Sequence, residues 1–565
     1  MIDSLTPEWW ALALLLVVLA LYRRVAAFLN LTKLGLRAGD WAPVSRDQAP
    51  AHVRYLLAQA GRALGALGFE RQGSQAGPPM NRLDPRALVF ADLYWHPRRA
   101  VLARVELAEP LTGQVTRVLL ISLFEDRRAL LTVNRELWAS LPEPPQTQVQ
   151  DAYGDDLDSQ WRLHLDTLAA RPGPALPVGD PLQVLRWQVD AIPGEALAQG
   201  LALGWLRQDA PGHYRFTAKG AWWYAGRLAR PSAEVRRALT RPYQHDPAPA
   251  RKAARLAEMD GLAAHIALAA EPLPAWMKGS LFLVTLALSA VLFGSGFGVL
   301  DAAALLMVLL IHELGHLAAM AACGYRNLSI FFLPLLGAAA KGHKPDAPPW
   351  QEALVLLAGP VTGLLATLGL AMIPVQGLPP DLAEFLRAAV LMGLVLNLFN
   401  LLPIGMLDGG RLVELALLGR FPFLRAGFAL VGVLVGIGFA IWVESPLLAA
   451  AMGLLMFSMP LQFKAARAIR SIRSRVRATG LASLDGEQAI RALGREFARD
   501  GYGGNDGKGW ARRVAIAKLV YPRLRQGVPS LGLSLGVAVA QLAALALPLV
   551  VVTWDLRGQV SLPLL

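Results

Sequence analysis

Cysteine and charged residues are both scarce in this chain. Its one cysteine, Cys323, excludes an internal disulfide bond and is expected to be an inert, small apolar side chain. Only 17% of the 565 residues are charged, whereas 54% are hydrophobic. A soluble protein of this length carries more charge, so the composition indicates a membrane protein with one or two globular portions beside its membrane part.

The first apolar run lacks the features of a cleavable leader. It covers about residues 8–22 and ends at Arg23 and Arg24. Its positive charges follow the apolar stretch instead of preceding it, and no small-residue cleavage site is recognisable. We therefore interpret residues 1–24 as a retained N-terminal membrane anchor.

Further apolar runs are long enough to cross a bilayer as helices, which takes about 20 residues. They cover residues 279–299, 302–323, 350–374, 384–404, 426–443, 445–462 and 531–553. Together with the anchor they predict an all-α transmembrane bundle of about eight spans, combined with a cytoplasmic α+β region. An even number of spans places both ends of the chain on the same side of the membrane.

The net charge of +13 is unevenly distributed among the loops. If the chain starts outside, the outer segments hold mainly acidic residues, and the inner segments hold the basic ones, including a dense run after residue 463. Basic residues gather on the cytoplasmic side of membrane proteins because translocating them is unfavourable. We therefore predict a multi-pass protein of the plasma (inner) membrane with most soluble residues in the cytoplasm. Because the orientation in the membrane accounts for the positive charge, nucleic acid is not an expected partner.

Two stretches are too polar to lie within a membrane. Residues 25–275 are expected to form the cytoplasmic α+β region, and residues 464–530 a basic cytoplasmic segment. They flank an intramembrane core at 276–463 and precede a last span with its tail at 531–565. The α+β region is expected to hold a helix, four strands and a linker rich in Pro and Gly. The helix is expected at about 50–68 and the linker at 171–180. The strands are expected at 87–95, 100–107, 115–124 and 128–134.

Residues about 190–225 suggest a second kind of function. A helix, a turn and a strand with the pattern Tyr-x-Phe-Thr resemble part of a winged-helix module, which binds DNA or docks proteins. An ordinary helix–turn–strand unit is the simpler interpretation. The helix, expected at 194–206, carries no basic residue before its end, which argues against DNA binding. Docking of a cytoplasmic protein partner through residues 25–275 is the other function that this region could have.

The third predicted span carries a motif that suits a metal ion. It contains His312, Glu313 and His316 in the order His-Glu-x-x-His. Residues four apart share one helical face, so both imidazoles can bind one ion, and the glutamate can take a proton from metal-activated water. Such residues are costly within a span unless they are paired, buried or ligated. The alternative is a polar cluster that only packs helices together.

A zinc ion with two His ligands needs a third protein ligand and an open position for water. The fifth predicted span is interrupted at Pro403, and Asp408 follows it, directly before two glycines. The proline and the glycines break the helix, so the backbone can turn Asp408 inward. Alone, this pattern would be a turn or a helix stop. Beside a histidine pair that lacks a ligand, it predicts Asp408 as the third ligand.

The two motifs together resemble those of the site-2 protease family, the intramembrane zinc metalloproteases of peptidase family M50. The resemblance covers about residues 302–412. It implies a zinc ion (Zn2+) bound by His312, His316 and Asp408, with Glu313 as the catalytic residue.

The resemblance also implies residues that bind the substrate. Asn400 matches a family position close to the bound substrate, and Gly337 lies in a segment similar to the membrane-dipping β-hairpin thought to present the substrate strand. Gly363 stands where the family usually has an asparagine, and Gly405 and Met406 replace a pair of prolines. These departures concern the fit of the substrate more than the binding of the metal.

The expected function is therefore hydrolysis of peptide bonds in transmembrane or membrane-adjacent substrates, in regulated proteolysis. The expected partners are a transmembrane protein or peptide substrate and membrane lipids. One alternative is a non-catalytic membrane receptor or chaperone that keeps the protease fold, for which loss of Glu313 or of a ligand would be evidence. The other is a membrane-tethered DNA-binding regulator built on the helix and wing.

Overall fold

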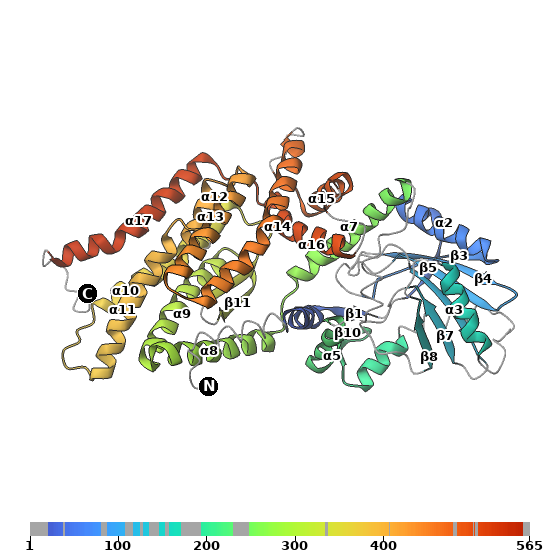
Figure 1. Ribbon diagram of the computed structural model, residues 1–565, viewed down its shortest axis with the longest axis horizontal. Coiled ribbons are helices and arrows are strands. Elements are labelled where there is room, and N and C mark those ends of the chain that lie inside the picture. The colour runs from blue at the N-terminus through green and yellow to red at the C-terminus, as the bar shows by residue number, and fades with distance from the viewer. Residues whose placement is uncertain are drawn as a thin grey trace. The chain divides into compact units, whose positions relative to one another are not determined.

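The computed structural model describes residues 21–37, 40–80, 88–107, 117–124, 128–134, 146–152, 157–170, 194–229, 248–333, 337–405, 407–477, 483–500, 502 and 507–556 (Figure 1). The chain divides into two compact units. The first includes Leu273–Ala489 and Lys518–Leu565, and the second includes Leu21–Pro272 and Ile490–Ala517, each as far as it is described. The predicted anchor at 1–24, apart from residues 21–24, and the predicted linker at 171–180 lie outside the described residues.

Seven helices in the described part of the first unit are long and apolar enough to cross a membrane. They match the seven runs predicted after the anchor, which confirms a multi-pass membrane protein. These helices are α8 (Ala275–Phe297), α9 (Val299–Ala322), α10 (Pro349–Ala371), α11 (Pro380–Leu401), α13 (Pro422–Trp442), α14 (Pro446–Arg477) and α17 (Leu531–Leu556).

Proline marks the first residue of several of these helices. Helices α10, α11 and α13 all have it there, where its missing N–H group costs nothing and its fixed φ angle suits a helix. Helix α14 continues without a break from the last apolar residues of its span into the basic run after 463. Helices α15 (Gly486–Asp500) and α16 (Gly507–Arg525) follow it.

A β-hairpin and a short helix interrupt the membrane helices. Strands β11 (Arg326–Leu333) and β12 (Gly337–His343) pair antiparallel, with Phe332 opposite Ala338. Gly337 has a φ angle of 116°, a conformation that favours glycine. The short helix α12 (Asp408–Ala416) follows the break after α11. The hairpin lies where the family resemblance expects one.

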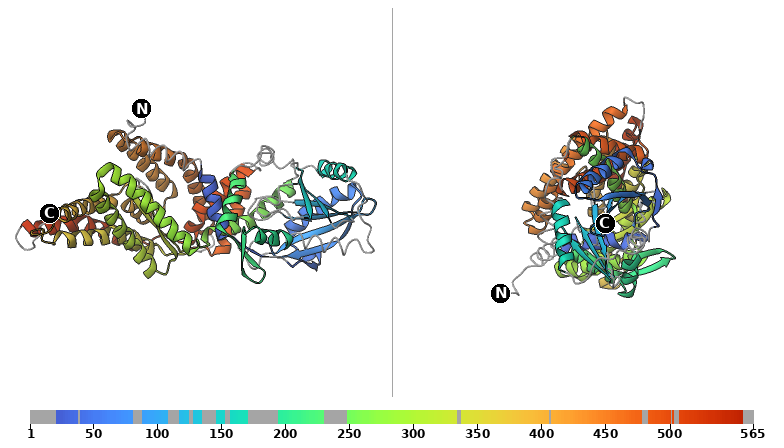
Figure 2. Two further views of the ribbon diagram at one scale, coloured as in Figure 1. Left: turned by 90° about the horizontal axis from the view of Figure 1, so that it is seen from below. Right: turned by 90° about the vertical axis from the view of Figure 1, so that its right-hand side faces the viewer.

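The second unit contains a seven-stranded sheet in the order β2-β3-β4-β5-β6-β7-β8 (Figure 1, with two further views in Figure 2). All neighbours are antiparallel except β7 and β8. The strands are β2 (Ala42–Val44), β3 (Glu70–Gly77), β4 (Val89–His96), β5 (Val101–Glu106), β6 (Arg117–Leu123), β7 (Ala129–Val133) and β8 (Thr147–Asp151). The four predicted strands are β4 to β7, and the predicted α+β character of the region is confirmed.

Two helices pack against the seven-stranded sheet. Leu57 and Leu64 of α2 (Ala51–Ala66) and Trp161 of α3 (Leu157–Ala169) share one buried cluster with Val105 and Leu120 of the sheet. Alternate residues of β5 and β6 belong to a separate buried cluster, as the two-residue period of a strand requires.

A second, three-stranded sheet includes the helix-and-wing segment. Strands β9 (Leu206–Ala210) and β10 (His213–Phe216) form the hairpin, and β1 (Gly35–Arg37) pairs with β10. The helix expected at 194–206 already ends at 202. Gly204 has a φ angle of 66°, which turns the chain after the helix and allows Leu206 to begin β9. Helices α5 (Ala218–Ala229) and α7 (Ala248–Ala270) follow.

Candidate metal centre

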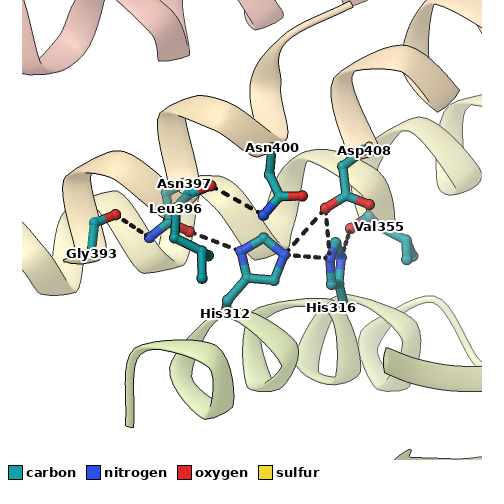
Figure 3. Close-up of polar contacts among 8 residues, drawn as sticks. All are labelled: His312, His316, Val355, Gly393, Leu396, Asn397, Asn400 and Asp408. Atoms are coloured by element: carbon teal, nitrogen blue, oxygen red, sulfur yellow. Dashed lines mark hydrogen bonds and ion pairs between the residues drawn. The ribbon is translucent and has the colours of Figure 1, made fainter. Parts of the chain in front are cut away.

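Three side chains converge from two helices of the first unit (Figure 3). His312 and His316 lie four residues apart on α9, and Asp408 is the first residue of α12. Asp408 Oδ2 lies 3.2 Å from the Nε2 atom of each histidine, and the two Nε2 atoms are 3.1 Å apart. The structure therefore brings together the three residues proposed from sequence as ligands.

The size of this triangle fits one zinc ion. Zinc binds nitrogen and oxygen ligands at about 2.0–2.2 Å in tetrahedral geometry, which places neighbouring ligand atoms about 3.3 Å apart. The three distances of 3.1–3.2 Å lie close to that value. Atoms that carry lone pairs repel one another at such distances unless a cation or a proton lies between them.

Hydrogen bonds on the far side of each imidazole leave its Nε2 atom available. His316 Nδ1 lies 2.7 Å from the carbonyl oxygen of Val355, which can only accept, so Nδ1 carries the proton. His312 Nδ1 lies 2.8 Å from Asn397 Oδ1, and the Asn397 amide nitrogen donates to the Gly393 carbonyl at 2.7 Å. That second bond fixes the orientation of the amide, so His312 also donates from Nδ1. Both Nε2 lone pairs then point at the triangle, as metal ligation requires.

The residues around Asp408 explain why glycines follow it. A Cβ atom on Gly409 would collide with the carbonyl oxygen of Leu401, and one on Gly410 with that of Ile404. The start of α12 therefore lies directly against the backbone that leaves α11. Gln541 of α17 reaches the same place, because its amide donates to the carbonyl oxygens of Leu401 and Gly409.

Close packing of α9 against α10 also depends on glycine. Gly359 faces the imidazole of His316, and Gly315 faces the Ala358 carbonyl and the side chain of Thr362. Neither position has room for a Cβ atom, so a larger residue at either would push the helices apart. The glycine before Pro360 thus has a packing role in holding a histidine of the triangle.

Glu313 lies beside the triangle and is 5% exposed. Its carboxylate accepts a hydrogen bond from the backbone amide of Ala340 in β12. The hairpin that contains Gly337 is therefore adjacent to the carboxylate proposed as the base.

Asn400 and Asn397 differ in what they contact. The Asn400 amide donates to the Leu396 carbonyl of its own helix at 3.1 Å, and Figure 3 shows its side chain on the Asp408 side of His312. Asn397 instead bonds another helix, through its contact with His312 of α9. A Cβ atom on Gly363 would collide with the Asn397 amide. The absence of a side chain at 363 thus leaves the space that Asn397 fills.

One segment of this chain is similar to known proteins. The profile of peptidase family M50 matches residues 301–379 and 375–441. "Putative zinc metalloprotease sll0528" of Synechocystis is 35% identical over 118 residues, which are 21% of this chain and 31% of that protein. "Stage IV sporulation protein FB" of Bacillus subtilis is 31% identical over 126 residues, 22% of this chain and 42% of that protein. The chain thus spans less than half the length of either relative.

A solved structure is also similar, the site-2 protease from Methanocaldococcus jannaschii. It matches 33% of this chain and 88% of its own, with 23% sequence identity and a TM-score of 0.24. The family profile and the two relatives agree with the resemblance of the motifs. The segment 301–441 of this chain thus matches peptidase family M50, and this match and the two relatives support its resemblance to the site-2 protease family of membrane metalloproteases.

Proposed function

We propose that this chain is a zinc metalloendopeptidase that cleaves transmembrane or membrane-adjacent proteins in regulated proteolysis. The observation that carries the proposal is the triangle of His312, His316 and Asp408, in which both imidazoles are held through Nδ1 and direct Nε2 at the shared centre. A cluster that only packed helices would not need three ligand atoms at the spacing that one zinc ion requires. The two histidines are buried, Asp408 is partly buried, and beside them lies a buried carboxylate, Glu313, for which the described residues show no salt bridge.

Each residue of the site then has a defined task. His312, His316 and Asp408 would hold the zinc ion, which when bound supplies a Lewis acid that polarises a peptide carbonyl and activates water. Glu313 takes a proton from the attacking water and returns it to the amine that leaves. The buried position strengthens the electrostatic interactions of this carboxylate, because little water screens it.

The hairpin offers an edge for an extended substrate. The outer edge of β11 is already bonded to α8, because the Phe332 amide donates to Thr285 Oγ1 at 3.0 Å and Lys278 Nζ donates to the Leu328 carbonyl at 3.2 Å. The opposite edge belongs to β12, whose Ala340 amide points at Glu313. A substrate segment that pairs with β12 would therefore lie beside the base. It must first unwind, because an intact helix uses its own carbonyl groups.

Two substrate contacts complete the proposal. Gly337 begins the strand that would pair with the substrate, and Asn400, whose side chain Figure 3 draws near Asp408, would contact the substrate there. Membrane lipids are the second partner. We place the protein in the plasma (inner) membrane with the second unit in the cytoplasm, on the basis of the charge distribution along the sequence.

Neither alternative function gains support from the site. A receptor or chaperone that keeps the fold would have no need for Glu313 and three converging ligands, and all four are present. For DNA binding, the wing would offer Arg207 and Arg215, but Asp209 pairs with both, at 3.3 and 2.7 Å. The helix at 194–202 before the wing carries no basic residue. Phosphate contacts, which supply most of the affinity for DNA, are therefore few.

The proposal is tested by replacing the base. Glu313→Gln keeps the shape and the hydrogen bond from Ala340 but cannot take a proton, so we expect normal zinc content and cleavage slowed about 10²- to 10⁴-fold. Membranes that contain wild-type or Glu313→Gln protein are compared by quantitative proteomics, with His312→Ala as the metal-free control. Fragments that appear equally with all three proteins would refute the assignment.

A further inference from the structure

We infer that the last membrane helix, α17, is part of the metal centre, and that Gln541 is a positioning residue for the third ligand. The inference rests on the proposed function, since it concerns how Asp408 is held for zinc. Helix α17 begins at Leu531, well beyond the segment 301–441 that matches the peptidase family. Nothing in the family match assigns it a part in the site.

Gln541 joins the two backbone segments on either side of the break before Asp408. Its Nε2 atom donates to the carbonyl oxygen of Leu401, the last residue of α11, at 2.8 Å, and to that of Gly409, the second residue of α12, at 3.2 Å. The side chain is 7% exposed. One amide group thus sets the distance between the end of α11, which carries Asn397 and Asn400, and the start of α12, which carries Asp408.

The Leu401 carbonyl requires such a donor. The last carbonyl groups of a helix have no partner within it, and Pro403 and the turn that follows supply no continuing helix after α11. An unpaired carbonyl in a membrane interior is costly, so a fixed donor there is strongly favoured. Gln541 satisfies this group and links it to α12 at the same time.

The rest of α17 holds α12 along its length. Ser534 Oγ donates to the Ala416 carbonyl, the last residue of α12, at 2.6 Å. Val537 packs in one buried cluster with Leu412 and Leu415 of α12. Further along, Ala544 packs with Leu401. Gln541 and Ser534 of α17 therefore contact opposite ends of α12, Gln541 at the Asp408 end and Ser534 at the far end.

An amide in this helix is not needed for packing alone. The apolar window of α17 at 531–548 would be more favourable in a membrane with leucine at 541. Polar side chains within spans are costly and are associated with function. The amide of Gln541 bonds Gly409, the residue next to Asp408, so its function is to position that ligand.

The test compares three full-length proteins in detergent. Gln541→Met keeps the length and volume of the side chain but removes both hydrogen bonds, and Ser534→Ala removes one hydrogen bond at the other end of α12. Zinc affinity is measured by competition with a chromophoric chelator, and thermal unfolding is measured on the same samples. We expect Gln541→Met to weaken zinc binding about 10-fold or more, the lower end of the effect of outer contacts on metal ligands. Ser534→Ala should bind zinc as the wild type does.

Cobalt(II) gives a second measurement that a purely structural role would not change. The visible absorption bands of the cobalt-loaded protein report the geometry of its ligands, so they should shift in Gln541→Met and not in Ser534→Ala. If Gln541→Met does not fold, Gln541→Asn replaces it, because a side chain one methylene shorter keeps the polarity but cannot reach both carbonyl groups.

The outcomes separate this inference from the proposed function. If the wild type binds zinc, His312→Ala does not, and Gln541→Met binds as the wild type does, the inference is refuted and the metal centre stands. Equal weakening in Gln541→Met and Ser534→Ala would also refute it, because the effect would then be general loosening of α17. If the wild type itself binds no zinc, the proposed function fails and this inference fails with it.

Discussion

Asparagine occurs twice on α11, three residues apart, and the two side chains are expected to have separable effects. Asn397 is fully buried and accepts a hydrogen bond from His312 Nδ1 at 2.8 Å. Asn400 bonds only the Leu396 carbonyl of its own helix among the hydrogen bonds seen in the described residues. The substitutions Asn397→Leu and Asn400→Leu therefore change the same residue type on the same helix, and only the first removes a contact to a ligand.

The magnitude for Asn397→Leu follows from the bond that is lost. Without its acceptor, the Nδ1–H group of His312 is left buried and unsatisfied, which costs about 1–3 kcal/mol. The ring can avoid that cost by moving its proton to Nε2, and a protonated Nε2 cannot bind a metal. Loss of an outer contact typically weakens metal binding about 10- to 100-fold, which corresponds to about 1.4–2.7 kcal/mol. Asn400→Leu should leave zinc affinity unchanged and should reduce only the cleavage of substrates.

The assay is zinc competition against a chelator, with purified wild-type, Asn397→Leu and Asn400→Leu proteins in the same detergent. Thermal unfolding of the metal-free proteins serves as the control for damage to α11. Wild-type zinc affinity in Asn397→Leu would refute the argument from the histidine proton. Equal loss of zinc in both variants would show that α11 as a whole, and not its contact to His312, controls the site.

Three further predictions concern other parts of the chain. Asp408→Asn weakens a ligand, so zinc content and cleavage should fall together, which atomic absorption and the proteomic comparison would show; retained zinc would exclude Asp408 as a ligand. Gly363→Asn should lower the unfolding temperature, because the new side chain collides with Asn397, and adding Asn397→Gly should restore it; no recovery in the double variant would contradict the shared space. Burial lowers the pKa of His164 from 6.5 to about 3, so this ring stays neutral in the folded second unit. The unfolded chain therefore binds a proton that the folded chain does not, and the stability that His164 contributes above pH 6.5 is lost as the pH falls towards 3. His164→Gln should flatten the dependence of the unfolding temperature on pH over that range, and an unchanged slope would contradict the assignment.

Local patterns in the sequence were sufficient for much of the fold. Each membrane helix is defined by a continuous apolar run, and the His-Glu-x-x-His spacing places two side chains on one face of α9 whatever surrounds it. The strands β4 to β7 alternate or run apolar over short distances in the same way. Strands β2, β3 and β8 were not predicted, because they are short or polar and are fixed by pairing with strands from elsewhere in the chain.

The contacts around the site depended on the tertiary structure instead. No spacing rule connects Gln541 to Asp408 or Asn397 to Gly363, since each pair comes from different helices. A signal existed for Gln541, because a glutamine in an apolar span is costly and indicates a buried partner. For Asn397 there was a signal as well, because Gly363 stands where the site-2 protease family usually has an asparagine. Only the packing of α10 against α11 shows that the Asn397 side chain fills the space beside Gly363.

The buried polar side chains of the membrane helices also indicate where the chemistry is. His312 and Asn397 are bonded to each other, His316 to a backbone carbonyl, and Gln541 to the backbone beside Asp408. Each of these groups would be costly in an apolar interior without its partner. Their partners all lie in the helices that surround one triangle of ligand atoms, so these four polar side chains gather at a single place. A bundle that needed only stability would be better served by apolar side chains at those positions, and the arrangement is therefore best explained by a metal ion that must be held in a fixed geometry.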